Sequence, residues 1–349
     1  MIGQRLQSGM PGATLTGLPL ADLADLLGSR TRALAARKWL FEARPFPGEL
    51  PARIAGVSER AWSAVRAAAP LPAWRLAQQQ EAPDGTTKVA LELGRATVET
   101  VLIPAEERTT VCVSSQAGCT RHCQFCATAT IGFARNLTAG EIVLQYAVAR
   151  AAAPPERPAR NVVFMGMGEP MDNLDEVLIA VNVLTEEAAP RLSSGHVTVS
   201  TSGVLPEMKR FLKESRAHLA LSLNATTDEQ RERLMPHNRT WPIAALLDAL
   251  REDQAHGSRR RYFIEYVLWQ DVNDTDDDAR RLAALLTDLP AHVNLIPHNA
   301  FDASPLRAPA DERVFAFQAR LQEAGLRALI RWPRGREVAA ACGQLARKR

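Results

Sequence analysis

The sequence predicts an α/β protein built around a parallel sheet. From about residue 111 onward, short apolar runs alternate with longer segments in which apolar residues recur at helical spacing. Repeated strand–helix units of this kind form parallel sheets with right-handed crossovers. The pattern alone leaves two architectures open: an open doubly wound sheet, and a full or partial barrel.

The residues before this sheet predict two smaller elements. LPLADLADLL and RALAARKWLFEA, within 18–69, place apolar residues at i, i+3 and i+4, and Trp39 and Phe41 can fill a small core. PLPAW at 70–74 is typical of a linker. TKVALEL and ATVETVLIP, which flank Gly94, predict a β-hairpin.

The remaining elements alternate along the chain. The predicted strands are 111–115, 162–165, 197–200, 219–223, 263–268, 292–296 and 326–330. The predicted helices begin at 174 and lie near 205–215, 243–256, 276–288 and 312–324.

Composition indicates a soluble, cytoplasmic enzyme. The chain has 349 residues, of which 46% are hydrophobic and 23% charged. No apolar run approaches the roughly 18 residues of a membrane span, and the N-terminus lacks the apolar stretch of a signal peptide. In a reducing compartment, clustered thiols are more often metal ligands or catalysts than disulfides.

Net charge is only +3, but the basic residues are grouped. The groups are Arg30, Arg32, Arg37, Lys38 and Arg44; Arg259–Arg261; and Arg331, Arg334, Arg336, Arg347, Lys348 and Arg349. They can form a surface that follows nucleic-acid phosphates. Solvated helix ends and a frayed tail explain the same charges equally well.

Three of the five cysteines, Cys119, Cys123 and Cys126, lie in GCTRHCQFC. This loop follows the first predicted core strand, at the end where parallel barrels place their chemistry. Three thiolates can bind three irons of a cubane cluster and leave the fourth iron open. A structural zinc site needs a fourth ligand, such as His122 or a distant residue. Inert cysteines are the third alternative.

Six motifs then resemble one known family in order along the chain. CxxxCxxC after a first barrel strand resembles the radical S-adenosylmethionine (SAM) enzymes. VCVSSQAGCTRHCQFC, NVVFMGMGEP, VTVSTSG, LALSLNA, NLIPHN and ACGQL together resemble the RlmN and Cfr family of RNA adenosine methyltransferases. The resemblance extends from about residue 99 to 346. The predicted helices within 18–69, the helical module, resemble the family's RNA-binding region.

The resemblance implies a fold and cofactors. The fold is a partial (β/α)6 TIM-like barrel with a small N-terminal helical domain. The implied domains of the chain are a helical RNA-binding domain at 1–70, a linker and hairpin at 71–104 and a radical SAM barrel at 105–349. A [4Fe–4S] cluster on the three clustered cysteines and two SAM molecules per turnover are implied.

Six residues match the family's SAM-binding positions. Gly168 and Glu169 stand in MGMGEP, where they are expected to contact the SAM amino group. The others are Ser200, Ser222, Asn224 and Asn299, each at the carboxyl end of a predicted strand. Asn224 replaces a histidine of some members. Each residue alone can equally be a turn former.

The resemblance also gives the remaining thiols a purpose. Cys342 takes a methyl group from one SAM, and a radical derived from a second SAM removes hydrogen from that methyl group. The carbon radical then adds to adenine. Cys112 attacks the Cys342 sulfur, which releases the base and leaves a disulfide for reduction. Glu99 matches a proton acceptor, although strand alternation can place it on a solvent face and Cys112 can remove the same proton.

The expected substrate is an unstacked adenosine in RNA. RlmN-type members modify C2 of an adenosine in 23S rRNA and, in some members, of the tRNA adenosine 3′ of the anticodon. Cfr modifies C8 of the same rRNA adenosine. A rival of another class is a noncatalytic metal-bearing RNA-binding protein. A flavodoxin or ferredoxin reductant and a monomer are also expected.

Overall fold

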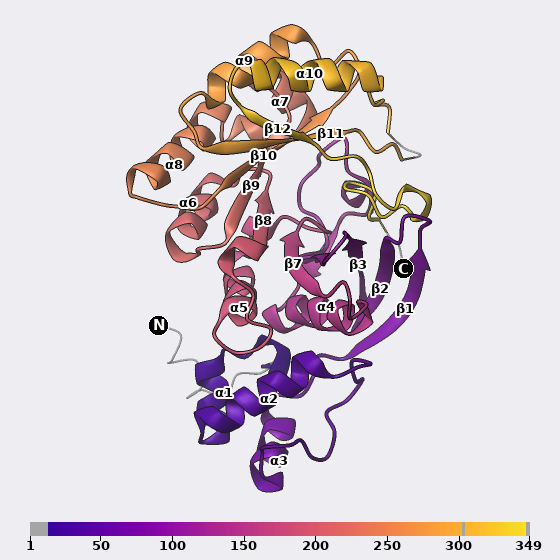
Figure 1. The fold of residues 1–349 in the computed structure, drawn as a ribbon, viewed down its shortest axis with the longest axis vertical. Coiled ribbons are helices and arrows are strands. Elements are labelled where there is room, and N and C mark those ends of the chain that lie inside the picture. Colours follow the sequence, from indigo (N-terminus) through magenta and orange to yellow (C-terminus); the bar gives the residue numbers. More distant parts are fainter. Residues whose placement is uncertain (1–12, 302–303, 347–349) are drawn as a thin grey trace.

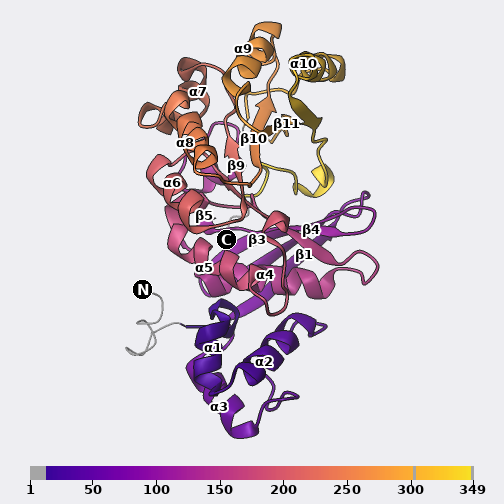
Figure 2. The same cartoon turned by 60° about the vertical axis from the view of Figure 1, so that its left-hand side comes forward.

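A computed structural model describes residues 13–301 and 304–346. Ten strands form one curved sheet in the order β1-β2-β3-β4-β7-β8-β9-β10-β11-β12 (Figures 1 and 2). Among the described residues, the edge strands β1 and β12 do not pair with each other, so the sheet is not a closed barrel.

Seven neighbouring strands of this sheet are parallel. They are β4 (Thr109–Cys112), β7 (Ala159–Phe164), β8 (Val197–Thr201), β9 (His218–Ser222), β10 (Tyr262–Leu268), β11 (Ala291–Pro297) and β12 (Arg327–Ile330). The connecting helices are α4 (Ala139–Ala152), α5 (Leu174–Thr185), α6 (Leu205–Glu214), α7 (Asp228–Leu234), α8 (Ile243–Ala255), α9 (Asp276–Leu286) and α10 (Asp311–Glu323). Except for α7, which packs over the carboxyl ends of β8 and β9, they lie along the outer side of the sheet (Figure 1). The predicted partial barrel of six strand–helix units is confirmed, with β12 as a further strand.

Helix α4 is absent from the sequence-based expectation. Thr138 and Glu141 cap its N-terminus reciprocally in a capping box. Ten of its residues are buried, so the helix has little contrast between an apolar and a polar face. That contrast is the periodic signal by which amphipathic helices are recognised.

Three antiparallel strands extend the sheet beyond β4. They are β1 (Trp74–Glu81), β2 (Thr87–Leu93) and β3 (Ala96–Pro104). The predicted hairpin around Gly94 is confirmed as β2 and β3. The predicted linker gives way to β1 at Trp74. This edge strand is largely exposed and its sequence, WRLAQQQE, lacks apolar alternation.

The N-terminal helices pack directly on the barrel. They are α1 (Leu20–Leu27), α2 (Arg30–Glu42) and α3 (Glu59–Ala68), and their buried side chains belong to the same apolar core as the barrel. The Thr16 hydroxyl donates to the Gly140 carbonyl at 2.8 Å. A Cβ at Gly17 would stand 2.6 Å from the Gly140 backbone nitrogen, so a glycine at position 17 permits this close approach.

The first basic group is partly used to dock these helices rather than to face solvent. Arg37 is fully buried and forms an ion pair with Glu186 at 2.9 Å. Arg30 pairs with Glu187, and Arg44 donates to the Ala153 carbonyl. The part of the chain described here contains no helix with the length and apolar character of a membrane span.

Candidate active site

The cysteine loop begins after β5 (Gln116–Gly118), which follows β4, and ends at β6 (Phe133–Asn136). Gly118 has a φ of +82°, and a Cβ there would lie 1.8 Å from the Gly132 carbonyl oxygen. The Cys119 amide donates to that same carbonyl at 3.1 Å. Glycine at this position therefore lets the loop close and fixes where its first cysteine begins.

The thiols of this loop lie close enough for their charges to interact. Burial, and then Cys126 and Cys119, raise the pKa of the Cys123 thiol. Burial also raises the pKa of Cys119 to about 12, and Glu169 and Cys126 add to the shift. Cys119, Cys123 and Cys126 are each partly buried, and a cationic partner stabilises thiolates that are partly removed from water.

A [4Fe–4S] cluster fits this set of donors. In a cubane each thiolate binds its own iron, so the ligands surround the cluster instead of converging on one ion. Within residues 13–301 and 304–346, no three His, Cys, Asp or Glu side chains form a group that could hold a metal ion. His122, the candidate zinc ligand, is exposed to solvent.

Gly168 and Glu169 form a tight turn after β7. Gly168 has a φ of +103°, and a Cβ there would stand 2.7 Å from the Gln116 amide nitrogen. The buried Glu169 carboxylate accepts from the backbone amides of Ser202 at 2.8 Å and Met171 at 3.0 Å. Burial raises its pKa and these hydrogen bonds oppose the shift. A carboxylate has lone pairs left for an amino group.

Two predicted or neighbouring site residues have buried polar atoms that lack hydrogen-bond partners among the described residues. They are the Ser202 hydroxyl, next to Glu169, and the Asn299 amide oxygen, next to Cys342. Buried polar atoms are nearly always satisfied, so these two fit a bound polar ligand such as SAM. Ser200 on β8 and Ser222 on β9 are half-buried beside them in the sheet.

Asn224 differs from the other predicted SAM contacts because both ends of its amide are engaged. Its oxygen accepts from the Val267 amide at 2.9 Å and its nitrogen lies 3.4 Å from the Met235 sulfur. Its φ is +62°, a conformation that asparagine tolerates better than most residues. The observed role of Asn224 is therefore to join the end of β9 to β10.

Cys112 and Cys342 line one cavity of about 530 Å³. Cys112 is buried at the end of β4, whereas Cys342 is exposed on the C-terminal segment. Burial and the nearby Cys342 raise the pKa of Cys112. Partial removal of the thiol from water by surrounding protein atoms, and secondly the Glu265 charge, raise the pKa of Cys342 to about 11. All five cysteines are free thiols.

The segment carrying Cys342 is tied to the cysteine loop. The Ala127 amide donates to the Gly343 carbonyl at 2.7 Å, and the Thr128 hydroxyl donates to the Leu345 carbonyl at 2.5 Å. The Asn299 side-chain amide donates to the Cys342 carbonyl at 3.1 Å. These bonds place the Cys342 thiol beside the predicted cluster and SAM site.

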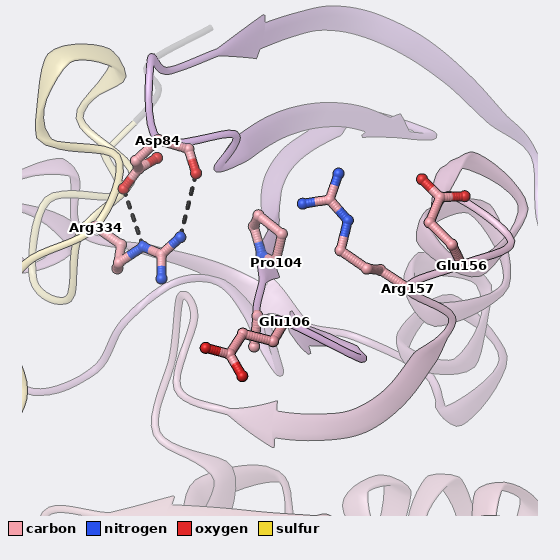
Figure 3. A pocket seen from close by; sticks show the side chains of 7 residues that line it. Asp84, Pro104, Glu106, Glu156, Arg157 and Arg334 are labelled. Carbon is pink, nitrogen blue, oxygen red and sulfur yellow. Dashed lines mark hydrogen bonds and ion pairs between the residues drawn. The ribbon is translucent and has the colours of Figure 1, made fainter.

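The antiparallel strands hold the other side of the same segment. Glu99 on β3 is buried, not on a solvent face; it pairs with Lys88 at 3.1 Å and accepts from the Ala346 amide at 3.0 Å. Arg334 donates to Asp84 in the β1–β2 turn at 3.1 Å (Figure 3). Glu99 thus anchors the chain end against the antiparallel strands.

Sequence reasoning missed two charged residues at this site. Arg231 on α7 is fully buried and donates to the carbonyls of Ser202 at 2.5 Å and Ser222 at 3.0 Å, which ties the ends of β8 and β9 together. Its segment, DEQRERL, resembles a solvated helix face. Glu265 on β10 lines the cavity. A carboxylate inside the apolar run FIEYVL is the sequence feature that could have marked it as a site residue.

The comparisons with known proteins agree with this geometry. A radical SAM superfamily model matches residues 113–283. A radical SAM methyltransferase from Sphaerobacter thermophilus has a similar crystal structure, with a TM-score of 0.87, 37% identity and coverage of 96% of this chain and 99% of that chain.

Curated relatives extend the similarity over nearly the whole chain. The dual-specificity RNA methyltransferase RlmN of Anaeromyxobacter is 43% identical, over 96% of this chain and 91% of its own. A probable RNA methyltransferase of Sorangium cellulosum is 42% identical, over 98% and 94%. The chain therefore belongs to the RlmN family of radical SAM RNA methyltransferases.

Proposed function

We propose that this enzyme methylates C2 of an adenosine in 23S rRNA and of the adenosine 3′ of the tRNA anticodon. The observation that supports this most is the shared cavity of Cys112 and Cys342, held beside the cysteine loop. Relatives named dual-specificity RNA methyltransferases support two RNA substrates.

The cofactor-binding roles follow from the geometry described above. Cys119, Cys123 and Cys126 would hold the [4Fe–4S] cluster, which supplies the electron that splits SAM. Glu169 would accept hydrogen bonds from the SAM amino group, next to Gly168. The remaining SAM contacts would come from Ser200, Ser222 and Asn299, and Asn224, whose side-chain amide is already engaged, would support them by holding the end of β9. We add Ser202 to this set because its buried hydroxyl has no partner among the described residues.

Cys342 would act as the methyl carrier. Its thiolate displaces the methyl group from a SAM sulfonium, which forms an S–C bond and releases the demethylated cosubstrate. Exposure of Cys342 lets both SAM and RNA reach it. Its pKa is raised to about 11, so the thiol form predominates at neutral pH and methyl transfer requires removal of the thiol proton.

Cys112 would release the product. Its thiolate attacks the Cys342 sulfur, an S–S bond forms and the S–C bond to the base breaks. The electron pair stays on the carbon, which takes a proton and becomes the methyl group. Glu99 is the proposed acceptor of the C2 proton, with Cys112 as the alternative. A flavodoxin or ferredoxin would supply electrons to a cytoplasmic monomer.

Two other functions make different predictions. A Cfr-like enzyme would methylate C8, and a noncatalytic RNA-binding protein would have no use for two thiols in one cavity. Mass spectrometry of nucleosides from RNA treated with the reconstituted enzyme separates all three. We expect 2-methyladenosine; 8-methyladenosine or unmodified RNA would contradict the proposal.

A further inference from the structure

Glu265 is an acidic residue inside the cavity that also contains Cys342. It lies in the middle of β10, between Ser222 of β9 and Asn294 of β11 in the sheet register. Its side chain lines the cavity that contains Cys342, and it is 7% exposed. Among the described residues that line this cavity, it is the one carboxylate.

One oxygen of the carboxyl group is fixed and the other is open. The Asn294 side-chain amide donates to Oε1 at 2.8 Å, and Arg331 Nε donates to the Asn294 oxygen at 2.9 Å. No hydrogen bond from a described residue reaches the second oxygen, Oε2. The Asn294–Arg331 chain therefore orients the Glu265 carboxyl and leaves bonding capacity toward the cavity.

The protonation of Glu265 suits a neutral partner with both donor and acceptor groups. Burial raises its pKa to about 7, and the Asn294 hydrogen bond and the Arg331 charge oppose the shift. Near neutral pH a large share of molecules therefore carry the acid form. A carboxylic acid both donates and accepts, and adenine presents an acceptor at N1 beside a donor at its 6-amino group.

We propose that Glu265 recognises the target base by binding the N1 and 6-amino edge of adenine, so that C2 faces Cys342. This rests on the proposed function. C2 is bonded to N1, whereas C8 lies on the other side of the purine beside N7. Glu265 lies close enough to Cys342 for their charges to interact, so a base bound through this edge brings C2 to the methyl-carrying sulfur.

The test compares base analogues at the target position in synthetic RNA. The 1-deazaadenosine analogue lacks the N1 acceptor, purine riboside lacks the 6-amino group, and 7-deazaadenosine keeps the recognised edge. Methylation kcat/KM is measured for the wild type and for Glu265→Met and Glu265→Gln. Each analogue's own reactivity cancels when its ratio to adenosine is compared between variants.

We expect Glu265→Met to lower kcat/KM for adenosine RNA by tenfold or more. The ratio of kcat/KM for adenosine to that for 1-deazaadenosine or purine riboside should be at least tenfold smaller in Glu265→Met than in the wild type. Glu265→Gln, which can still donate to N1 and accept from the amino group, should keep the discrimination. The ratio of kcat/KM for adenosine to that for 7-deazaadenosine should be the same in the wild type and in both variants.

An anchoring role alone predicts a different result. If Glu265 only holds Asn294 and Arg331 in place, Glu265→Met should lower kcat/KM by the same factor for every analogue. Asn294→Ala should then have the same effect. Equal discrimination in wild type and Glu265→Met would overturn the inference. Lack of methylation of adenosine RNA by the wild type would instead refute the proposed function.

Discussion

The Cys112 and Cys342 thiols, on the first core strand and on the C-terminal segment, line one cavity, and Cys342 adds to the raised pKa of Cys112. Backbone hydrogen bonds hold the Cys342 segment against the cysteine loop, and Glu99 and Lys88 hold it against the antiparallel strands. The two thiols are therefore positioned by the fold before any substrate binds.

The cluster assignment predicts a distinction among the five cysteines. Anaerobically reconstituted wild type should contain four iron and four sulfide per chain, a stoichiometry expected of [4Fe–4S] clusters. Cys119→Ala, Cys123→Ala and Cys126→Ala should each lose most of the iron. Cys112→Ala is the matched control and should retain it. Iron and sulfide analysis with Mössbauer spectroscopy measures this, and stoichiometric zinc without iron would reject the assignment.

The Arg37–Glu186 pair predicts how the helical module is held. Arg37→Met leaves the Glu186 carboxylate in a largely buried position without its cation, which costs about 3–5 kcal/mol. Limited proteolysis of the holoenzyme should then cleave the N-terminal helices much faster. The double variant Arg37→Met with Glu186→Leu should recover most of the protection. Equal cleavage rates in wild type and Arg37→Met would show that the pair does not secure the module.

RNA binding by the helical module depends on its exposed cations. Arg32 and Lys38 are exposed on α2, unlike the buried Arg37. Arg32→Glu with Lys38→Glu should weaken RNA affinity by about tenfold or more at low salt, with a smaller loss at high salt, because phosphate contacts release counterions. Lys213→Glu, an exposed change on α6, is the control. RNA affinity equal to that of the control across the salt series would count against this role.

The raised pKa of Glu265 predicts a pH dependence. The acid form donates to N1, so its contribution is present below pH 7 and is lost as the pH rises through about 7. The charged or titratable groups near it are Arg331, through Asn294, and Cys342. The ratio of wild-type to Glu265→Gln kcat/KM should fall up to about tenfold per pH unit above 7. The ratio cancels the titrations of groups that Glu265 does not influence; a flat ratio from pH 6 to 8.5 would refute the prediction.

Most strands of the barrel could be predicted because they are short apolar runs separated by helical segments. Helix α4 could not, since burial on several sides removes its polar face. Strand β1 could not, since an exposed edge strand needs no apolar alternation. The motif residues were found by resemblance, whereas the bonding of Asn224 to Val267 and the burial of Arg231 depend on tertiary contacts that no local pattern reveals.

The central claim is that Cys342 carries the methyl carbon to adenine C2 and that Cys112 releases it. Trapping the covalent species tests this most directly. Cys112→Ala should still methylate Cys342 and still cleave SAM, but should accumulate protein joined to RNA, and Cys342→Ala should form no such adduct. Tandem mass spectrometry of the digested adduct should locate the bond between the Cys342 methylene and C2. A bond to C8, or no adduct in Cys112→Ala despite a methylated Cys342, would contradict the account.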